Sequence, residues 1–142
     1  MGTLYETDFV AWAQEQAALL RNGNLSAIDA LNIAEEIESV GRSERNELKS
    51  RMIVLLSHLL KWQFQVDHRG RSWEQTIKLQ RSDIWALLRG SPSLKHLFED
   101  EKFLENLWLH AAVQAGDQIK LDLPRSWIWP LDLVLDDNFW RE

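Results

Sequence analysis

Three side chains of the sequence, Glu35, Glu38 and His58, are of types that could bind a divalent metal ion. Glu35 and Glu38 would share a face of a helix, and a histidine on a facing helix could complete a carboxylate–imidazole site. Dinuclear carboxylate bundles need a Glu-x-x-His pair on each of two helices, and the chain has no such pair. We therefore favour a structural bridge from Glu38 or Glu35 to His58 or a nearby arginine. A carboxylate beside His58 would raise its pKa.

A second group combines basic and aromatic side chains, as surfaces that grip phosphate and stack bases do. Its members are Lys61, Arg71, Trp73 and Arg81. They lie in segment 41–90, which has ten basic and five acidic residues and so carries +5, whereas the rest carries −11. This segment makes a nucleic-acid-associated factor the alternative interpretation. The overall charge of −6 argues against it, and arginine over tryptophan is also a common internal contact.

Other catalytic chemistry has no support in the sequence. The serines are not in a G-x-S-x-G motif, the glycines do not form a phosphate-binding loop, and there is no cysteine. We therefore assign no catalytic residue and no cofactor. Enzymatic activity stays open, and a metal-dependent enzyme built on Glu35, Glu38 and His58 is the third interpretation.

Helical periodicity runs through most of the chain. The pattern predicts helices near residues 5–21, 26–40, 43–66, 72–89, 91–116 and 131–135, and no segment alternates with a period of two. The segment at 43–66 carries the widest apolar arc, with Leu48, Met52, Leu55, Leu59 and Trp62 at spacings of three and four. We predict an all-α bundle of about five helices around this central helix. Gly41 either breaks or bends the chain before it.

The C-terminal segment from Leu121 to Trp140 is apolar but contains Pro124 and Pro130, which prevent a continuous helix. Left in water, it would make an unusually large apolar patch, so it must lie in a groove. The nearest apolar candidate is the central helix around Ile53, Leu56 and Leu60. Tryptophan is enriched at protein interfaces. We therefore expect this Pro/Trp-rich arm to leave exposed tryptophans for a partner, with three candidates: Trp127, Trp129 and Trp140.

Several blocks of the sequence, in order, form a specific pattern: LYETDFVAWAQEQAALL, AEEIESVGRSERNELKSR, LLSHLLKWQFQ, RSW, QRSDI and SPSL. This pattern resembles the bacterial domain-of-unknown-function family 29 over most of Leu4–Leu135. The chain departs from it at Val66, where related chains often have proline, and in the insertion Trp127–Trp129. The resemblance implies a small helical protein without an established activity, and it transfers no functional residues.

Length and composition complete the expectations. The 142 residues suit one helical domain spanning 1–142, and the longest apolar run has five residues, too few to cross a membrane. The chain begins without the features of a signal peptide, so we expect a cytoplasmic, bacterial protein. A protein-interaction module is the favoured function. It would bind a protein partner or form a modest homodimer, and neither nucleic acid nor membrane is expected as a partner.

Overall fold

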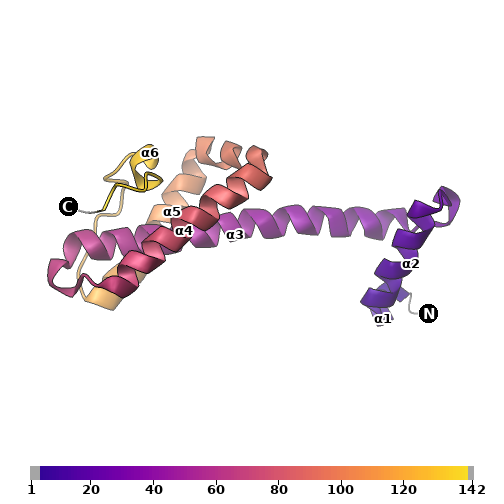
Figure 1. Cartoon of the computed structure of the whole chain (residues 1–142), viewed down its shortest axis with the longest axis horizontal. Helices are drawn as coiled ribbons and strands as arrows, with labels where there is room; N and C mark the ends of the chain where they lie inside the picture. The colour runs from indigo at the N-terminus through magenta and orange to yellow at the C-terminus, as the bar shows by residue number, and fades with distance from the viewer. Residues whose placement is uncertain (1–3, 141–142) are drawn as a thin grey trace. The chain divides into compact units, whose positions relative to one another are not determined.

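The computed structural model describes residues 4–140, which are mostly helical and contain no strand (Figure 1). The predicted all-α fold is therefore confirmed. The chain forms two compact units that divide between Ser43 and Glu44, and each is described by itself below. The single domain expected over 1–142 stays a prediction.

The N-terminal unit is a helical hairpin, called here the N-terminal hairpin (residues 4–43). It contains α1 (Leu4–Thr7), α2 (Phe9–Arg21), the 3₁₀ turn η1 (Leu25–Ala27) and the first turns of α3 (Ala30–Phe64). Asp8 begins α2 by accepting a hydrogen bond from the Ala11 amide at 3.1 Å. Gly23 has a φ of 72°, which lets the chain turn after α2.

Gly41 neither breaks nor ends a helix. It lies inside α3, so the two helices predicted on either side of it are one element of 35 residues. A glycine in a helix interior costs only about 1 kcal/mol relative to alanine, which the neighbouring turns readily offset. Glu38 and His58 therefore belong to one helix, so the expected placement of His58 on a helix that faces Glu38 is corrected.

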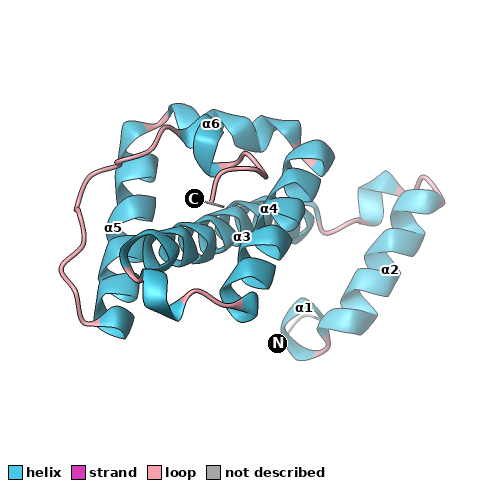
Figure 2. Cartoon of the chain, turned by 60° about the vertical axis from the view of Figure 1, so that its left-hand side comes forward, coloured by secondary structure: helices cyan, strands magenta, loops and turns pink. Residues whose placement is uncertain are grey.

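The C-terminal unit surrounds the second half of α3. After α3 come η2 (Val66–His68), α4 (Arg71–Gly90), the 3₁₀ helix η3 (Pro92–Glu99), α5 (Glu101–Ile119) and α6 (Leu131–Val134). Figure 2, which views α3 nearly end-on, shows α4 and α5 on opposite sides of it. The single helix predicted over 91–116 is instead two, because Asp100 interrupts it and caps α5 through the Lys102 amide.

The core of the C-terminal unit has the predicted stripe at its centre. Leu48, Met52, Leu55 and Leu59 are buried, as are residues of α4, α5 and the arm that surround them. At the end of α5, Lys120 adopts the left-handed conformation. The Leu121 carbonyl oxygen lies so close to Gly116 that a Cβ added there would be 2.7 Å from it. This tight turn directs the arm back over the bundle.

The length and apolar character of the helices in residues 4–140 decide whether any of them could cross a membrane. Although α3 and α4 are long, no helix in this described range combines the length and the apolar character needed to cross a membrane.

Candidate interaction surfaces

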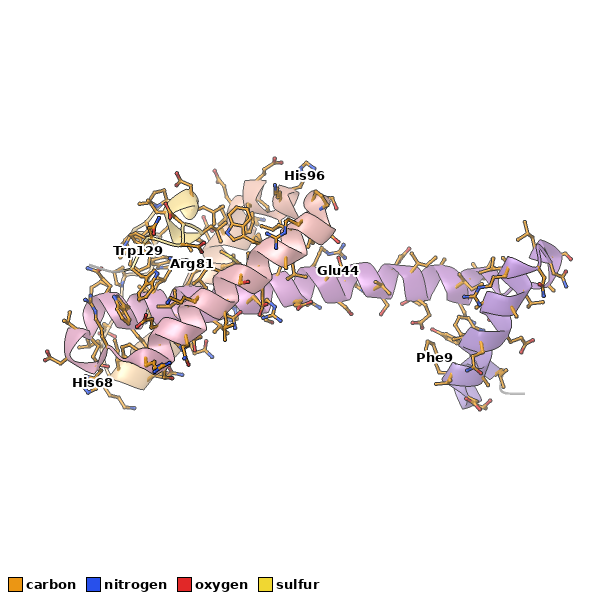
Figure 3. All side chains as sticks on the ribbon, viewed as in Figure 1. Phe9, Glu44, His68, Arg81, His96 and Trp129 are labelled. Atoms are coloured by element: carbon orange, nitrogen blue, oxygen red, sulfur yellow. The ribbon has the colours of Figure 1, made fainter. Side chains whose placement is uncertain are left out.

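The C-terminal arm is anchored to α4 by a buried arginine. Arg81 is only 1% exposed, and its guanidinium donates to the carbonyl oxygens of Val134, Asp137 and Phe139 at 2.9, 3.5 and 2.6 Å. Burial lowers the pKa of Arg81 to about 10, against the opposing effect of the nearby aspartates of the arm. Figure 3 labels Arg81 on the side of α4 that faces the arm. Arg81 is therefore a structural clamp.

The tryptophans of the arm make contacts within the chain. Trp127 donates from Nε1 to the Leu104 carbonyl at 2.7 Å, and its ring lies 5.2 Å from that of Trp108. Trp129 packs edge-on against Trp108 at 5.5 Å. Trp140 is buried and packs edge-on against Trp62 at 5.1 Å. Trp140 is therefore not left exposed for a partner, which corrects that part of the expectation. Trp127 and Trp129 are only partly buried, so an interaction role for these two stays a prediction.

The place where the arm docks also differs from the expected one. Its hydrogen bonds and ring contacts are with α4, α5 and Trp62, not with the second stripe around Ile53, Leu56 and Leu60. Leu56 and Leu60 are buried in the core. Ile53 lines an open groove of about 710 Å³ between α3 and α5. The arm lies where its carbonyls accept from α4 and where its Trp127 donates to α5. Hydrophobic periodicity does not reveal such hydrogen bonds.

The predicted basic-aromatic patch is only partly assembled. The Lys61 ammonium group lies 5.4 Å from the centre of the Trp73 ring, but it is largely buried and donates to Gln118 Oε1 at 2.7 Å. Burial lowers the pKa of Lys61. Arg81 faces the arm, and only Arg71 is exposed. Two of the three predicted cations are therefore engaged inside the protein and unavailable to phosphate.

The three candidate metal ligands are not brought together. Glu35 and Glu38 both pair with Arg42, at 3.0 and 3.7 Å, on the exposed side of the N-terminal hairpin. The nitrogen Nδ1 of His58 lies 2.8 Å from the Val54 carbonyl oxygen, which requires Nδ1 to carry a proton. Among residues 4–140, no group of three or more acidic or histidine side chains is placed to hold an ion. The predicted bridge from Glu38 thus goes to an arginine and not to His58.

His58 provides a pH-dependent prediction whose sign is opposite to the one expected from a carboxylate partner. Burial lowers the pKa of His58 below 6.5, the Val54 carbonyl opposes this, and Lys61 reinforces it. As the pH falls, the unfolded state therefore takes up the proton first. The contribution of His58 to the free energy of unfolding should be fully present above about pH 6.5. It should decrease as the pH falls toward the folded-state pKa of His58.

The measurement compares urea unfolding near neutral and near mildly acidic pH for the wild type and His58→Gln. The variant should lose less stability between the two conditions, whereas His110→Gln, at an exposed histidine of α5, should follow the wild type. An NMR titration that places the pKa of His58 above 6.5 would contradict the prediction.

The N-terminal hairpin is held together by polar contacts and by ring contacts among Tyr5, Phe9 and Trp12. Trp12 Nε1 donates to Asp29 at 3.1 Å, and the Asp29 amide donates to Gln16 at 2.7 Å. The Tyr5 hydroxyl donates to Glu36, and this carboxylate raises the pKa of Tyr5 to about 12. Hydrogen bonds from Asn32 and Trp12 lower the pKa of Asp29 although partial burial opposes them. The only buried side chains of α2 are Trp12 and Gln16, so the interior of this hairpin is small.

Large apolar side chains of the same hairpin remain exposed. Ile37 is 67% exposed and Val10 is 65% exposed, and Figure 3 labels Phe9, another of the set. The exposed large apolar residues of this unit are Leu4, Phe9, Val10, Leu20, Leu25, Leu31, Ile37 and Val40. Single exposed apolar residues are ordinary on protein surfaces, whereas large contiguous patches of them are typical of interaction sites.

Most of this surface was visible in the sequence as an amphipathic pattern. The helical spacing of Ile33, Ile37 and Val40 indicates an apolar face on the helix predicted near residues 26–40. The structure leaves Ile37 and Val40 exposed. Periodicity shows that a face must be covered but does not identify what covers it.

Comparison of the chain with known proteins finds one matching family. The family described as "Domain of unknown function DUF29" matches residues 4–140, which include both units. Neither the curated proteins nor the solved structures contain a match to the chain.

Proposed function

This chain belongs to the DUF29 family, a domain of unknown function, and we propose from its own surface that it is a protein-interaction module. The single observation that carries the proposal is the apolar surface of the N-terminal hairpin, where Val10, Ile37 and Val40 are each more than half exposed. The module would use this hairpin for docking and the C-terminal unit as its folded body.

The two units differ in how they use apolar residues. The buried core cluster belongs entirely to the C-terminal unit, from Leu48 to Trp140. The N-terminal hairpin buries far less, and isolated helices as short as α2 are marginal in water because they gain little from packing. A bound protein would supply the missing apolar contact. This contrast supports docking as the role of the hairpin.

The alternative functions have weaker support. A nucleic-acid site would need exposed cations beside aromatic rings, but Lys61 and Arg81 are engaged with Gln118 and the arm carbonyls. The metal-dependent enzyme would need Glu35, Glu38 and His58 to converge, and they bind Arg42 and the Val54 carbonyl instead. We therefore do not propose either function.

Site-specific photo-crosslinking in the expressing cell tests the proposal. A photoreactive amino acid replaces Val10 or Ile37 in the hairpin, and Glu38 serves as the control because it is exposed among charged neighbours. We expect discrete protein adducts at positions 10 and 37 but not at 38. An absence of protein adducts at positions 10 and 37, with the chain folded by circular dichroism, would overturn the proposed function.

A further inference from the structure

We propose that a cleft of the C-terminal unit binds a small phosphate ester with a planar ring, of the nucleoside monophosphate class. The cleft lies between α4 and the C-terminal arm, has a volume of about 410 Å³, and is called here the α4 pocket. Small-molecule sites typically have about 300–1,000 Å³ and orient their ligand with a few polar groups. The pocket lies outside the N-terminal hairpin, so its ligand would be additional to the protein partner proposed above.

One side of α4 supplies most of the lining of this pocket. Lys78, Ser82, Trp85 and Arg89 follow one another at spacings of four, three and four residues, which places them on the same face of the helix. All four side chains are exposed. Neighbours at these spacings are about 5–6 Å apart, so the row presents a cation, a hydroxyl, an aromatic ring and a second cation in order.

A buried positive charge forms part of the same pocket. Arg81 lines it and is only 1% exposed, and the three groups that accept from its guanidinium are neutral backbone carbonyls. Within residues 4–140, Arg81 has no ion pair with a carboxylate. Buried charges are normally paired, because an isolated charge is costly away from water. An anion in the pocket would compensate Arg81 through charge alone, while its N–H groups keep their bonds to the arm.

The charge balance of the pocket also favours an anion. Lys78, Arg81 and Arg89 contribute three positive charges to its lining and Asp137 contributes one negative charge, so the net charge is +2. The whole chain, in contrast, has a net charge of −6. A positive cleft on an acidic protein concentrates anionic ligands at that place.

The two exposed cations of the pocket are available to a ligand. Arg89 has no ion pair in the part of the chain that the structure describes. Lys78 pairs with the exposed Glu74 at 3.4 Å and lies 5.8 Å from the centre of the Trp140 ring. Both contacts are weak at exposed positions. Charge-assisted hydrogen bonds to a phosphate are stronger.

The remaining lining residues indicate what the phosphate is attached to. Trp85 is 36% exposed, and its Nε1 donates to the Leu135 carbonyl at 3.1 Å, which holds the ring in the pocket wall. Nucleobases stack on aromatic side chains held in this way. On the arm, Asp137 and Asn138 can accept hydrogen bonds from sugar hydroxyls, as acidic residues do from ribose in dinucleotide sites. Because Asp137 would repel inorganic phosphate but accept from a hydroxyl, the pocket favours the ester.

Isothermal titration calorimetry of the full chain tests the proposal, with AMP, GMP, CMP and UMP as probes. At least one should bind, roughly tenfold or more tightly than inorganic phosphate or its own nucleoside, because each of these retains only part of the contacts. Lys78→Gln and Arg89→Gln should each weaken this binding by roughly tenfold, since each removes a charge-assisted hydrogen bond. Arg71→Gln is the matched control, because Arg71 is an exposed arginine of α4 outside the pocket.

NMR spectra place the bound nucleotide. The indole N–H signal of Trp85, identified by its loss in Trp85→Phe, should shift when the nucleotide is added, whereas that of Trp12 in the N-terminal hairpin should not. Circular dichroism confirms that each variant is folded.

Three results would overturn the proposal. The first is an absence of binding by all these monophosphates at about millimolar concentration, and the second is equal weakening by Arg89→Gln and Arg71→Gln. The third is a single-stranded oligonucleotide that binds more tightly than every monophosphate, because nucleic acid would then replace the small ligand. A pocket for one nucleotide gives no such gain, since extended strands need a basic groove that follows their backbone.

Discussion

Replacing Trp108 with alanine should lower the free energy of unfolding by about 4–5 kcal/mol, the largest effect expected for a single core residue. Trp108 is completely buried in α5, and its ring contacts those of Trp127 and Trp129 at 5.2 and 5.5 Å. Its Nε1 also donates to the Pro124 carbonyl at 2.8 Å. Alanine removes these contacts together and leaves a cavity between α5 and the arm.

Urea unfolding followed by circular dichroism measures this loss. Trp108→Phe is the matched variant, because it retains an aromatic ring but leaves the Pro124 carbonyl without its donor. We expect this variant to lose roughly 1–3 kcal/mol. A loss below about 1 kcal/mol for Trp108→Ala would show that the arm does not depend on this residue.

Replacing Arg81 with alanine should lower the free energy of unfolding by about 3–5 kcal/mol and release the arm, because carbonyl oxygens lose their donor and a large buried side chain is removed. Three backbone carbonyls of the arm accept from this one guanidinium, and removing the donors leaves one buried and two partly buried oxygens without their partner. Lysine is an incomplete replacement, because its ammonium group lacks the planar fork that reaches several acceptors at once. Arg81→Lys should therefore also be destabilised, although less than Arg81→Ala.

Amide hydrogen exchange distinguishes release of the arm from general destabilisation. In Arg81→Ala, protection should fall first at the amides of Val134 in α6 and of Leu135 directly after it, while Leu55 and Leu59 in α3 stay protected. The control is Arg89→Ala, at an exposed arginine of α4, the helix that also carries Arg81. It should change the free energy of unfolding by no more than about 0.5 kcal/mol. Uniform loss of protection across both helices would contradict the clamp assigned to Arg81.

The sequence alone determined the all-helical class of the chain and the centre of the core. Helical spacing of Leu48, Met52, Leu55 and Leu59 is a local property, because residues three and four apart share one face whatever packs against it. The same periodicity, without any period-two alternation, established the all-α class. The ordered sequence blocks, from Leu4 onward, identified the family that matches residues 4–140.

Only the tertiary structure decided the roles of the polar and aromatic residues. Arg81 and Lys61 have the same side-chain chemistry in a phosphate site and in a buried clamp, and the difference lies in acceptors distant in the chain, on the arm and on α5. His58 likewise received a backbone carbonyl of its own helix where we expected a carboxylate. Such pairings depend on which segments meet, which local spacing does not encode.

The exposed apolar residues of the N-terminal hairpin show the same division. Their apolar period was present in the sequence, and only the structure showed that Ile37 and Val40 remain exposed while Trp12 is buried. Periodicity reports which residues of one helix lie together. Burial depends on the number and position of neighbouring elements, and these are fixed by contacts between distant parts of the chain or by a partner.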